Sequence, residues 1–239
     1  RICSDDFSRS ITRTTIKIVT TSAVVGLVLI PTILWALAFS RIYDRPHTWE
    51  KASRWLYANA PQGSVLTHEL WDDALPVDIV EENLYRNHYP RQIDMDIYQD
   101  MAPEAKFRHL AEAIHQADFI ILATPRLYGA VHRLPWRYPV EIRYYELLFT
   151  EQLGFNLAYA AMSYPTLWGW TFVDDEADES FSVYDHPKVL IYRKVRDLSD
   201  EELRALFGQT LEAKPLITRW SKERPVTLPV PHYRKPLLL

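Results

Sequence analysis

A long apolar run stands out near the start of the chain. No residue from Ile18 to Phe39 carries a charge. At about 1.5 Å per residue, a helix of this length spans roughly 30 Å, the thickness of the hydrocarbon layer of a bilayer. Apolar runs in the buried helices of soluble proteins rarely exceed about 14 residues. The run therefore predicts a transmembrane helix over residues 18–40, preceded by a short flank over residues 1–17.

The residues beside the run are those expected at a membrane surface. Lys17 and Arg41 bracket it, and Trp35 and Tyr43 lie near its end, where aromatic rings favour the headgroup level. Basic residues are equally numerous on both sides, but a long following domain counts for less in the positive-inside rule than a short tail. The charges therefore favour an extracytoplasmic domain. A small-x-small cleavage site does not follow the run, which disfavours a cleaved signal peptide.

Small polar residues and a proline interrupt the apolar run. Thr20, Thr21 and Ser22 lie near its start and Pro31 lies in its second half. Small hydroxyl-bearing residues favour close contacts between membrane helices. We expect these positions to face a protein neighbour, another transmembrane helix, rather than lipid.

Beyond the run, helical and strand periodicities alternate. The buried strand at 119–123 follows a strand and a helix, and this order predicts that the two strands pair in parallel. The intervening acidic and aromatic stretch, residues 69–101, lacks clear periodicity and predicts loops with room for one short helix. The elements predicted here are a helix over 47–59, a strand over 64–68, a helix over 103–116 and a strand over 119–123.

The second half of the domain has sharper start and stop signals. Pro139 begins a helix that we expect Gly154 to close as its C′ residue, before a strand over 155–161. Val183 and the apolar run 189–192 flank Asp185-His186-Pro187 and predict a hairpin. Ser199 and Glu202 have the spacing of a capping box, so a last helix begins there.

Together these elements predict an α/β fold: one transmembrane helix and a single small domain over residues 41–211, with a mostly parallel central sheet and a carboxyl-terminal hairpin. Five prolines interrupt the remaining residues, 212–239. We expect an extended tail there, either flexible or laid across a neighbour.

Composition narrows the classes of function. A net charge of −4 and a pI near 6.1 disfavour a nucleic-acid binder, which would show a basic stripe. Neither a GxGxxG nor a GxxxxGK[ST] phosphate loop occurs. The single cysteine, Cys3, precedes the apolar run, which excludes an internal disulfide and a cysteine metal site. The sequence predicts no cofactor and no metal.

The densest polar cluster comes just after the first predicted strand. It consists of His68, Glu69, Asp72 and Asp73. Open α/β sheets bind ligands beyond the carboxyl ends of their strands, so the cluster is a candidate ligand-binding site for a cation or a sugar. The alternative is that these carboxylates are solvated or cap a nearby helix.

A second candidate is a stretch rich in tyrosine, arginine and tryptophan. Such residues dominate binding hot spots and membrane interfaces, so the stretch can serve as a carbohydrate platform, a lipid-headgroup contact or a protein interface. The alternative is that half of the rings belong to the core. A GxSxG nucleophile motif is missing, and we predict no catalytic residue. The candidate interface residues are Arg126, Tyr128, Trp136, Arg137, Tyr144 and Tyr145.

Four ordered segments carry a family resemblance. They read ELWDDALP (69–76), ADFIILATPRLY (117–128), RYYELLF (143–149) with LGF (153–155), and SVYDHPKVLIYR (182–193). Residues 43–193 resemble the carboxyl-terminal extracytoplasmic region of the tyrosine-rich "YYY" family of polytopic membrane proteins, which is related to family 39 and protein mannosyltransferase-like glycosyltransferases. The resemblance implies a lipid-linked sugar donor and catalytic carboxylates in an early extracytoplasmic loop. The chain has no such loop, so no catalytic residue is carried onto it.

Two functions follow as expectations. In the first, the chain is the extracytoplasmic domain of a glycosyltransferase-like membrane protein, non-catalytic by itself, which binds the acceptor or gives structural support. In the second, it is a single-span accessory subunit of a larger membrane complex. Both place the chain in the cell membrane, with the bilayer and other transmembrane helices as its partners and no nucleic acid.

Overall fold

The computed structural model describes residues 2–214 and 224–231, with side chains from residue 19 onward. The chain divides into two compact units. The first consists of Arg1–Arg45 and Tyr164–Asp174, and the second of Pro46–Ser163 and Asp175–Leu239. Residues 164–174, which we expected within the α/β domain, thus group with the amino-terminal helix.

The first unit is built on helix α1 (Ile2–Ser40). The helix is longer than the predicted span because its amino-terminal flank is helical too. Its segment Val19–Ser40 is long and apolar enough to cross a membrane. Thr20, Thr21, Ser22 and Pro31 are all exposed on this single chain.

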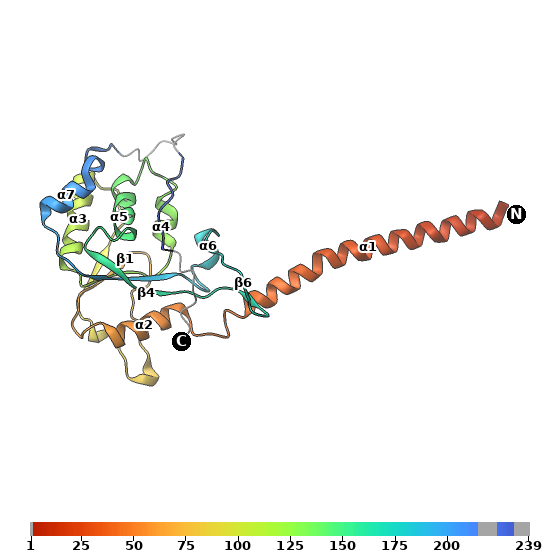
Figure 1. The fold of residues 1–239 in the computed structure, drawn as a ribbon, viewed down its shortest axis with the longest axis horizontal. Helices are drawn as coiled ribbons and strands as arrows, with labels where there is room; N and C mark the ends of the chain where they lie inside the picture. Colours follow the sequence, from red (N-terminus) through yellow and green to blue (C-terminus); the bar gives the residue numbers. More distant parts are fainter. Residues whose placement is uncertain (1, 215–223, 232–239) are drawn as a thin grey trace. The chain divides into compact units, whose positions relative to one another are not determined.

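A small hairpin completes the first unit. Strands β5 (Thr166–Leu167) and β6 (Trp170–Thr171) pair antiparallel. Strand β5 packs against the carboxyl-terminal part of α1 (Figure 1). Arg45 contacts the hairpin, and its Nη2 donates to Thr166 Oγ1 at 2.9 Å.

The second unit contains a five-stranded sheet of order β2-β1-β3-β7-β4. Strand β1 pairs in parallel with β2 and β3, which confirms the predicted parallel pairing of β1 with β3. Strand β7 runs antiparallel to both β3 and β4, so the sheet is mixed. The strands are β1 (Leu66–Glu69), β2 (Gln92–Met95), β3 (Phe119–Leu122), β4 (Phe155–Ala161) and β7 (Val189–Lys194).

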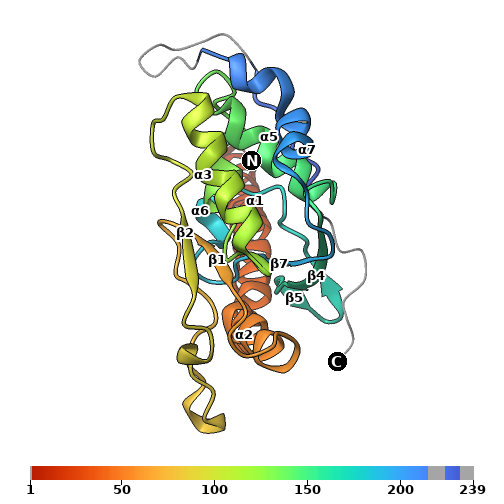
Figure 2. The ribbon, with the colours of Figure 1, turned by 90° about the vertical axis from the view of Figure 1, so that its left-hand side faces the viewer.

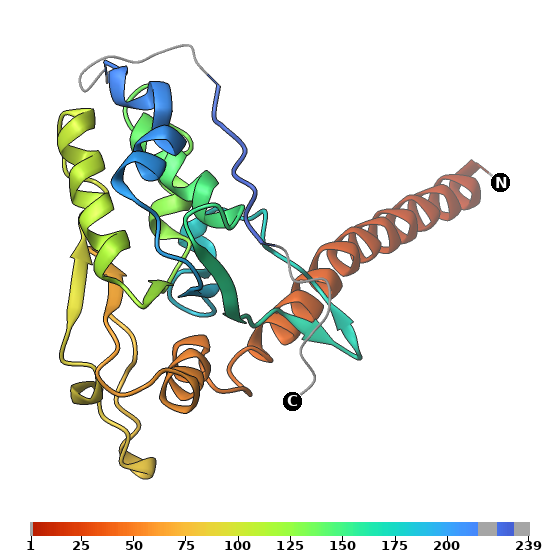
Figure 3. The same ribbon diagram turned by 60° about the vertical axis from the view of Figure 1, so that its left-hand side comes forward.

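Helices cover both faces of this sheet. Figures 2 and 3 show α3 (Pro103–Gln116), α5 (Pro139–Phe149) and α7 (Asp200–Phe207) on one face and α2 (Thr48–Asn59) on the other. The strands serve both layers because alternate side chains point to opposite faces. In β3, Ile120 and Leu122 join the α3–α5 core, whereas Phe119 and Ile121 join the α2 core. Shorter helical elements are α4 (Arg126–Val131), α6 (Glu179–Ser182), η1 (Val80–Glu82), η2 (Arg86–His88) and η3 (Gly208–Glu212).

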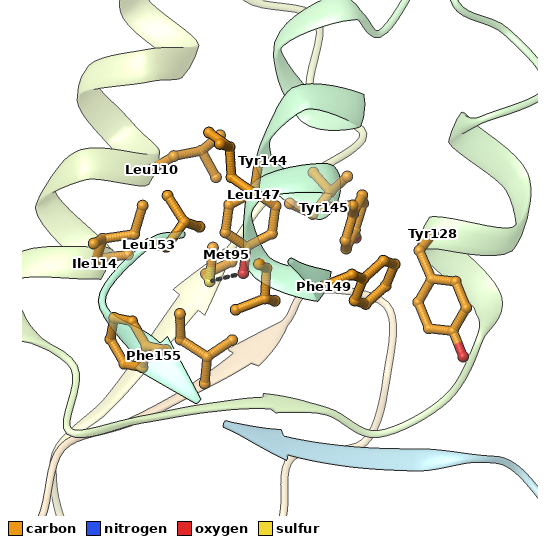
Figure 4. Close-up of a cluster of buried hydrophobic side chains, with 14 of the residues drawn as sticks. Met95, Leu110, Ile114, Tyr128, Tyr144, Tyr145, Leu147, Phe149, Leu153 and Phe155 are labelled. Carbon is orange, nitrogen blue, oxygen red and sulfur yellow. Dashed lines mark hydrogen bonds between the residues drawn. The ribbon is translucent and has the colours of Figure 1, made fainter. Parts of the chain in front are cut away.

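The larger core is rich in aromatic rings. Tyr144, Tyr145 and Phe149 of α5 are buried there (Figure 4), and Tyr128 of α4 lies edge-on to Phe149 with ring centroids 5.4 Å apart. The Tyr144 hydroxyl donates to the sulfur of Met95 at 3.8 Å. This bond gives the buried Tyr144 hydroxyl a partner, as most buried polar groups have.

Two local predictions are not confirmed. The expected hairpin around Asp185-His186-Pro187 does not form: the residues before it make α6, and β7 pairs with β3 and β4 instead. Gly154 is not the C′ residue of α5, which already ends at Phe149. Gly154 instead precedes β4 with φ +78°, where a Cβ atom would lie 2.2 Å from the carbonyl oxygen of Arg196.

The predictions for the last helix and the tail are partly confirmed. Ser199 and Glu202 form the predicted capping box of α7. Of the predicted tail, residues 212–214 and 224–231 are described. The segment 224–231 lies on the second unit itself: the amide of Val226 donates to the His132 carbonyl at 2.9 Å, and Leu228 is buried in the larger core. The rest of the predicted tail, 215–223 and 232–239, lies outside the described residues.

Candidate functional site

The candidate site lies at the carboxyl ends of two neighbouring parallel strands. Glu69 is the last residue of β1, and Thr124 follows the end of β3 by two residues. From β1 the chain moves to β2 on one side and returns through α3 to β3 on the other. Such a change of direction is where open α/β sheets bind ligands.

Asp72 ties the two strand ends together. Its side chain is only 2% exposed, accepts a hydrogen bond from Thr124 Oγ1 at 2.6 Å and pairs with Arg126 Nε at 2.9 Å. Thr124 Oγ1 in turn accepts from the Arg126 amide at 3.0 Å. Burial raises the pKa of Asp72, while the Thr124 hydrogen bond and the Arg126 charge lower it. The pair holds the loops after β1 and β3 in one arrangement.

Glu69 is a fully buried carboxyl group beside this pair. It is 1% exposed, and the Tyr145 hydroxyl from α5 donates to its Oε1. Its Oε2 has no hydrogen-bond partner within the described part of the chain. Burial raises the pKa of Glu69 to about 8, although the Tyr145 hydrogen bond acts to lower it. Glu69 is therefore mostly protonated at neutral pH and is a neutral, buried carboxyl group beside the Asp72–Arg126 pair.

Aromatic rings and a guanidinium group form the outer layer of the site. The Arg126 guanidinium lies over the Tyr184 ring, 5.4 Å from its centroid, and this ring is 72% exposed. His47 Nε2 lies 3.4 Å from the Tyr184 carbonyl oxygen. Trp71, next to Asp72, is also exposed and has φ +87°. Such a conformation is rare for a large side chain and is concentrated at functional sites.

The structure brings together only part of the predicted polar cluster. Glu69 and Asp72 lie at the site, but His68 points to the opposite face of the sheet because strand side chains alternate. His68 Nε2 there lies 3.2 Å from Oδ1 of Asp94, its neighbour in register on β2. Burial lowers the pKa of His68, and Asp94 opposes that shift. Asp73 is exposed.

The predicted aromatic interface is wrong for three of its six residues. Tyr144 and Tyr145 of α5 are buried in the larger core, and Tyr128 of α4 is buried against the α5 rings of Tyr145 and Phe149. The other three predicted interface residues are partly exposed. Trp136 is half-buried and Arg137 pairs with Asp100 at 2.9 Å, whereas Arg126 belongs to the site described above.

Sequence reasoning missed Thr124, Tyr184 and His47. Thr124 had a usable signal, because it directly follows the predicted buried strand and the carboxyl-end rule applies to it as well as to Asp72. Tyr184 had none, since its position depends on the path of α6 and on the pairing of β7.

The candidate site at the carboxyl ends of β1 and β3 can bind a ligand by hydrogen bonding and by stacking. The Arg126 guanidinium donates hydrogen bonds from a planar fork, whereas the Glu69 carboxyl is buried beneath the surface. Among the residues whose side chains are described, no group of three or more His, Cys, Asp or Glu is placed to hold a metal ion. No family model, no curated protein and no solved structure matches this chain.

Proposed function

We propose that this chain is the membrane-anchored extracytoplasmic domain of a glycosyltransferase-like membrane protein, and that it binds the acceptor without catalysing the transfer. One observation carries the anchoring: α1 leaves its apolar side chains uncovered. Leu27 is 75% exposed and Ile30 is 60% exposed, within a span that holds no charged residue from Val19 to Ser40.

Exposure of the apolar side chains of α1 to water is unfavourable. Each Å² of apolar area left in water costs about 25 cal/mol, and monomeric soluble proteins rarely expose contiguous apolar patches beyond a few hundred Å². The hydrocarbon layer of a bilayer covers such a helix without cost to its backbone, because every interior amide is bonded within the helix.

The candidate site at the carboxyl ends of β1 and β3 supports acceptor binding. Sugars present hydroxyl groups on a ring with apolar faces, so they suit a site that combines hydrogen-bonding groups with exposed rings. Arg126 supplies the hydrogen-bond donors, and the exposed Tyr184 and Trp71 supply the rings. The family resemblance of residues 43–193 supports the same class of ligand.

Membrane extraction tests the anchoring. The full chain, expressed in cells, should stay with the membranes after washing in alkaline carbonate. A Leu27→Asp/Ile30→Asp variant should be released, because each charge at the helix centre costs about 3 kcal/mol on the biological insertion scale. A Val80→Asp/Val195→Asp variant, with two exposed valines of the second unit, is the matched control and should remain. Release of the unaltered chain by carbonate would contradict the anchoring.

Glycan binding tests the site. The full chain in detergent, applied to an array of neutral oligosaccharides, should bind a subset of them, and Tyr184→Ala should weaken that binding. Tyr85→Ala, an exposed tyrosine of the η2 loop, serves as control. Assayed with a lipid-linked sugar donor, the chain alone should show no transfer. Equal binding by both tyrosine variants, or sugar transfer by this chain, would refute the proposed role.

A single-span accessory subunit is the second candidate. The exposed Thr20, Thr21 and Ser22 on α1 support a neighbouring membrane helix, which this candidate requires from a separate protein. Intact-mass measurement of the native protein separates the two functions. A mass near 28.1 kDa supports the subunit, and a mass several-fold larger supports the polytopic enzyme.

A further inference from the structure

The β5–β6 hairpin exposes an unusual amount of aromatic surface. Trp168 is 80% exposed and Trp170 is 75% exposed, and Phe172 and Val173 beside them are exposed as well. None of the residues 164–173 carries a charge. Large rings usually lie in a core or an interface, so a charge-free hairpin that presents two indoles to its surroundings indicates a surface that contacts something.

The turn of the hairpin holds these rings outward. Trp168 and Gly169 both have positive φ, +50° and +86°, as a two-residue type I′ turn requires. Such turns normally use Asn, Asp or Gly at the first of these positions. A tryptophan there is unfavourable for the backbone, and packing in this unit does not explain it because the ring is almost fully exposed.

The hairpin lies alongside the last turns of the apolar span. The Phe172 ring packs edge-on against Trp35 of α1, with centroids 5.6 Å apart. Trp35 precedes Ser40, the end of the span, by five residues, or about 7.5 Å along the helix axis. A side chain that touches Trp35 therefore lies beside the end of the membrane span and not beyond it.

We propose that the β5–β6 hairpin is a second membrane contact, with the Trp168 and Trp170 rings at the boundary between lipid headgroups and acyl chains. The proposal rests on the membrane anchoring of α1 proposed above, with which the hairpin shares one compact unit. Indole rings favour this boundary because they are apolar bodies with one polar N–H group. A two-stranded hairpin leaves backbone groups unpaired, so the boundary suits it and the hydrocarbon interior does not.

Charge at the end of the hairpin is compatible with a lipid surface. An acidic run, residues 174–179 (DDEADE), follows the hairpin in sequence, and unpaired carboxylates there would repel anionic headgroups. However, Asp175 pairs with Lys188 at 2.8 Å, and Arg133 pairs with Asp178 at 2.8 Å and with Glu179 at 2.6 Å. Lys188 and Arg133 thus offset two of the five negative charges.

Depth-dependent quenching tests this contact. The full chain, with Cys3→Ser, is labelled with a fluorophore at Trp168→Cys or at Thr171→Cys and is reconstituted in phosphatidylcholine vesicles. Thr171 is exposed and its replacement leaves both tryptophans in place. Val80→Cys, an exposed position of the second unit, is the matched control. Lipids that carry a nitroxide near the headgroup, lipids that carry one at mid-chain, and aqueous iodide are the quenchers.

Both hairpin labels should lose emission with headgroup-level nitroxide, lose less with mid-chain nitroxide and be protected from iodide, whereas the Val80 label should respond to iodide alone. Flotation of the vesicles is measured in the same samples. Protein that floats with hairpin labels quenched by iodide, or shielded from every quencher by a protein partner, would overturn the hairpin contact and leave the anchor intact. Protein that does not float would overturn the anchor itself.

Discussion

Replacing Glu69 with glutamine should change how the stability of this protein depends on pH. Glu69 is 1% exposed at the carboxyl end of β1, with the Tyr145 hydroxyl as its one hydrogen-bond donor among the described residues. Its pKa is about 8 in the folded chain, against 4.5 for an ordinary glutamate. Between these two pH values the folded state keeps a proton that the unfolded state has released. Stability therefore falls as the pH rises through this window and levels off above the folded pKa.

The size of the effect follows from the shift. One bound proton changes the free energy of unfolding by about 1.4 kcal/mol per pH unit, so Glu69 should remove about 4 kcal/mol between pH 5 and pH 8. Glu69→Gln cannot ionise, so its contribution to the slope disappears. The variant leaves an amide donor without a partner, which costs about 1–3 kcal/mol at every pH, but that cost does not alter the slope.

Unfolding followed by near-ultraviolet circular dichroism, for the full chain in detergent at a series of pH values, measures this slope. The difference between the unaltered chain and Glu69→Gln isolates the contribution of Glu69 from that of other groups such as His68. Glu104→Gln is the control: Arg204 lowers the pKa of exposed Glu104, so its titration lies below the window and its slope should match the unaltered chain. A Glu69→Gln slope equal to that of the unaltered chain would refute the assignment of a neutral, buried carboxyl.

Three further substitutions probe the second unit, each by chemical denaturation in detergent. Gly154→Ala should destabilise the fold by more than about 3 kcal/mol, because φ is +78° and the added methyl group would overlap the Arg196 carbonyl oxygen; a loss below 1 kcal/mol would contradict that close approach. Ser199→Ala should cost about 1 kcal/mol through the lost capping box, and Ser199→Asp should restore most of it. Arg126→Ala should cost about 3–5 kcal/mol because it leaves the buried Asp72 carboxylate without its cation, and Arg126→Ala/Asp72→Asn should recover part of the loss.

Local signals in the sequence predicted much of the fold. Pro103 at the first turn of α3, the four apolar residues of β3 and the capping box of α7 are each specified by residues within one turn or strand. The parallel pairing of β1 with β3 followed from their order along the chain. These features depend on neighbours in sequence, and the structure confirms them.

The pairing of strands that are far apart in sequence could not be predicted from the sequence. Strand β2 (Gln92–Met95) lacks an apolar run because it is a partly exposed edge strand, so its pattern did not distinguish it from a loop. The expected hairpin at residues 183–192 was wrong because β7 finds its partners in β3 and β4, far away in sequence. Only three-dimensional packing decides between such alternatives.

At the candidate site, one additional residue in β1 changes which side chains were predicted to lie together. The predicted first strand ended at His68, which placed His68 and Glu69 together in one loop cluster. The strand extends to Glu69, and the two-residue period then sends their side chains to opposite faces. Similarly, Tyr144 and Tyr145 are both core residues because α5 is covered on most of its circumference, which its own sequence does not reveal.

Labelling of cysteines from one side of the membrane tests the central claim, that α1 crosses the bilayer and leaves the second unit outside. Cys3 is the single cysteine of the chain and lies before the span. A membrane-impermeant maleimide added to intact cells should leave Cys3 unlabelled until the cells are permeabilised. The exposed Gln62→Cys, in a Cys3→Ser background, should be labelled at once. Labelling of both positions from the same side would contradict a membrane-spanning α1.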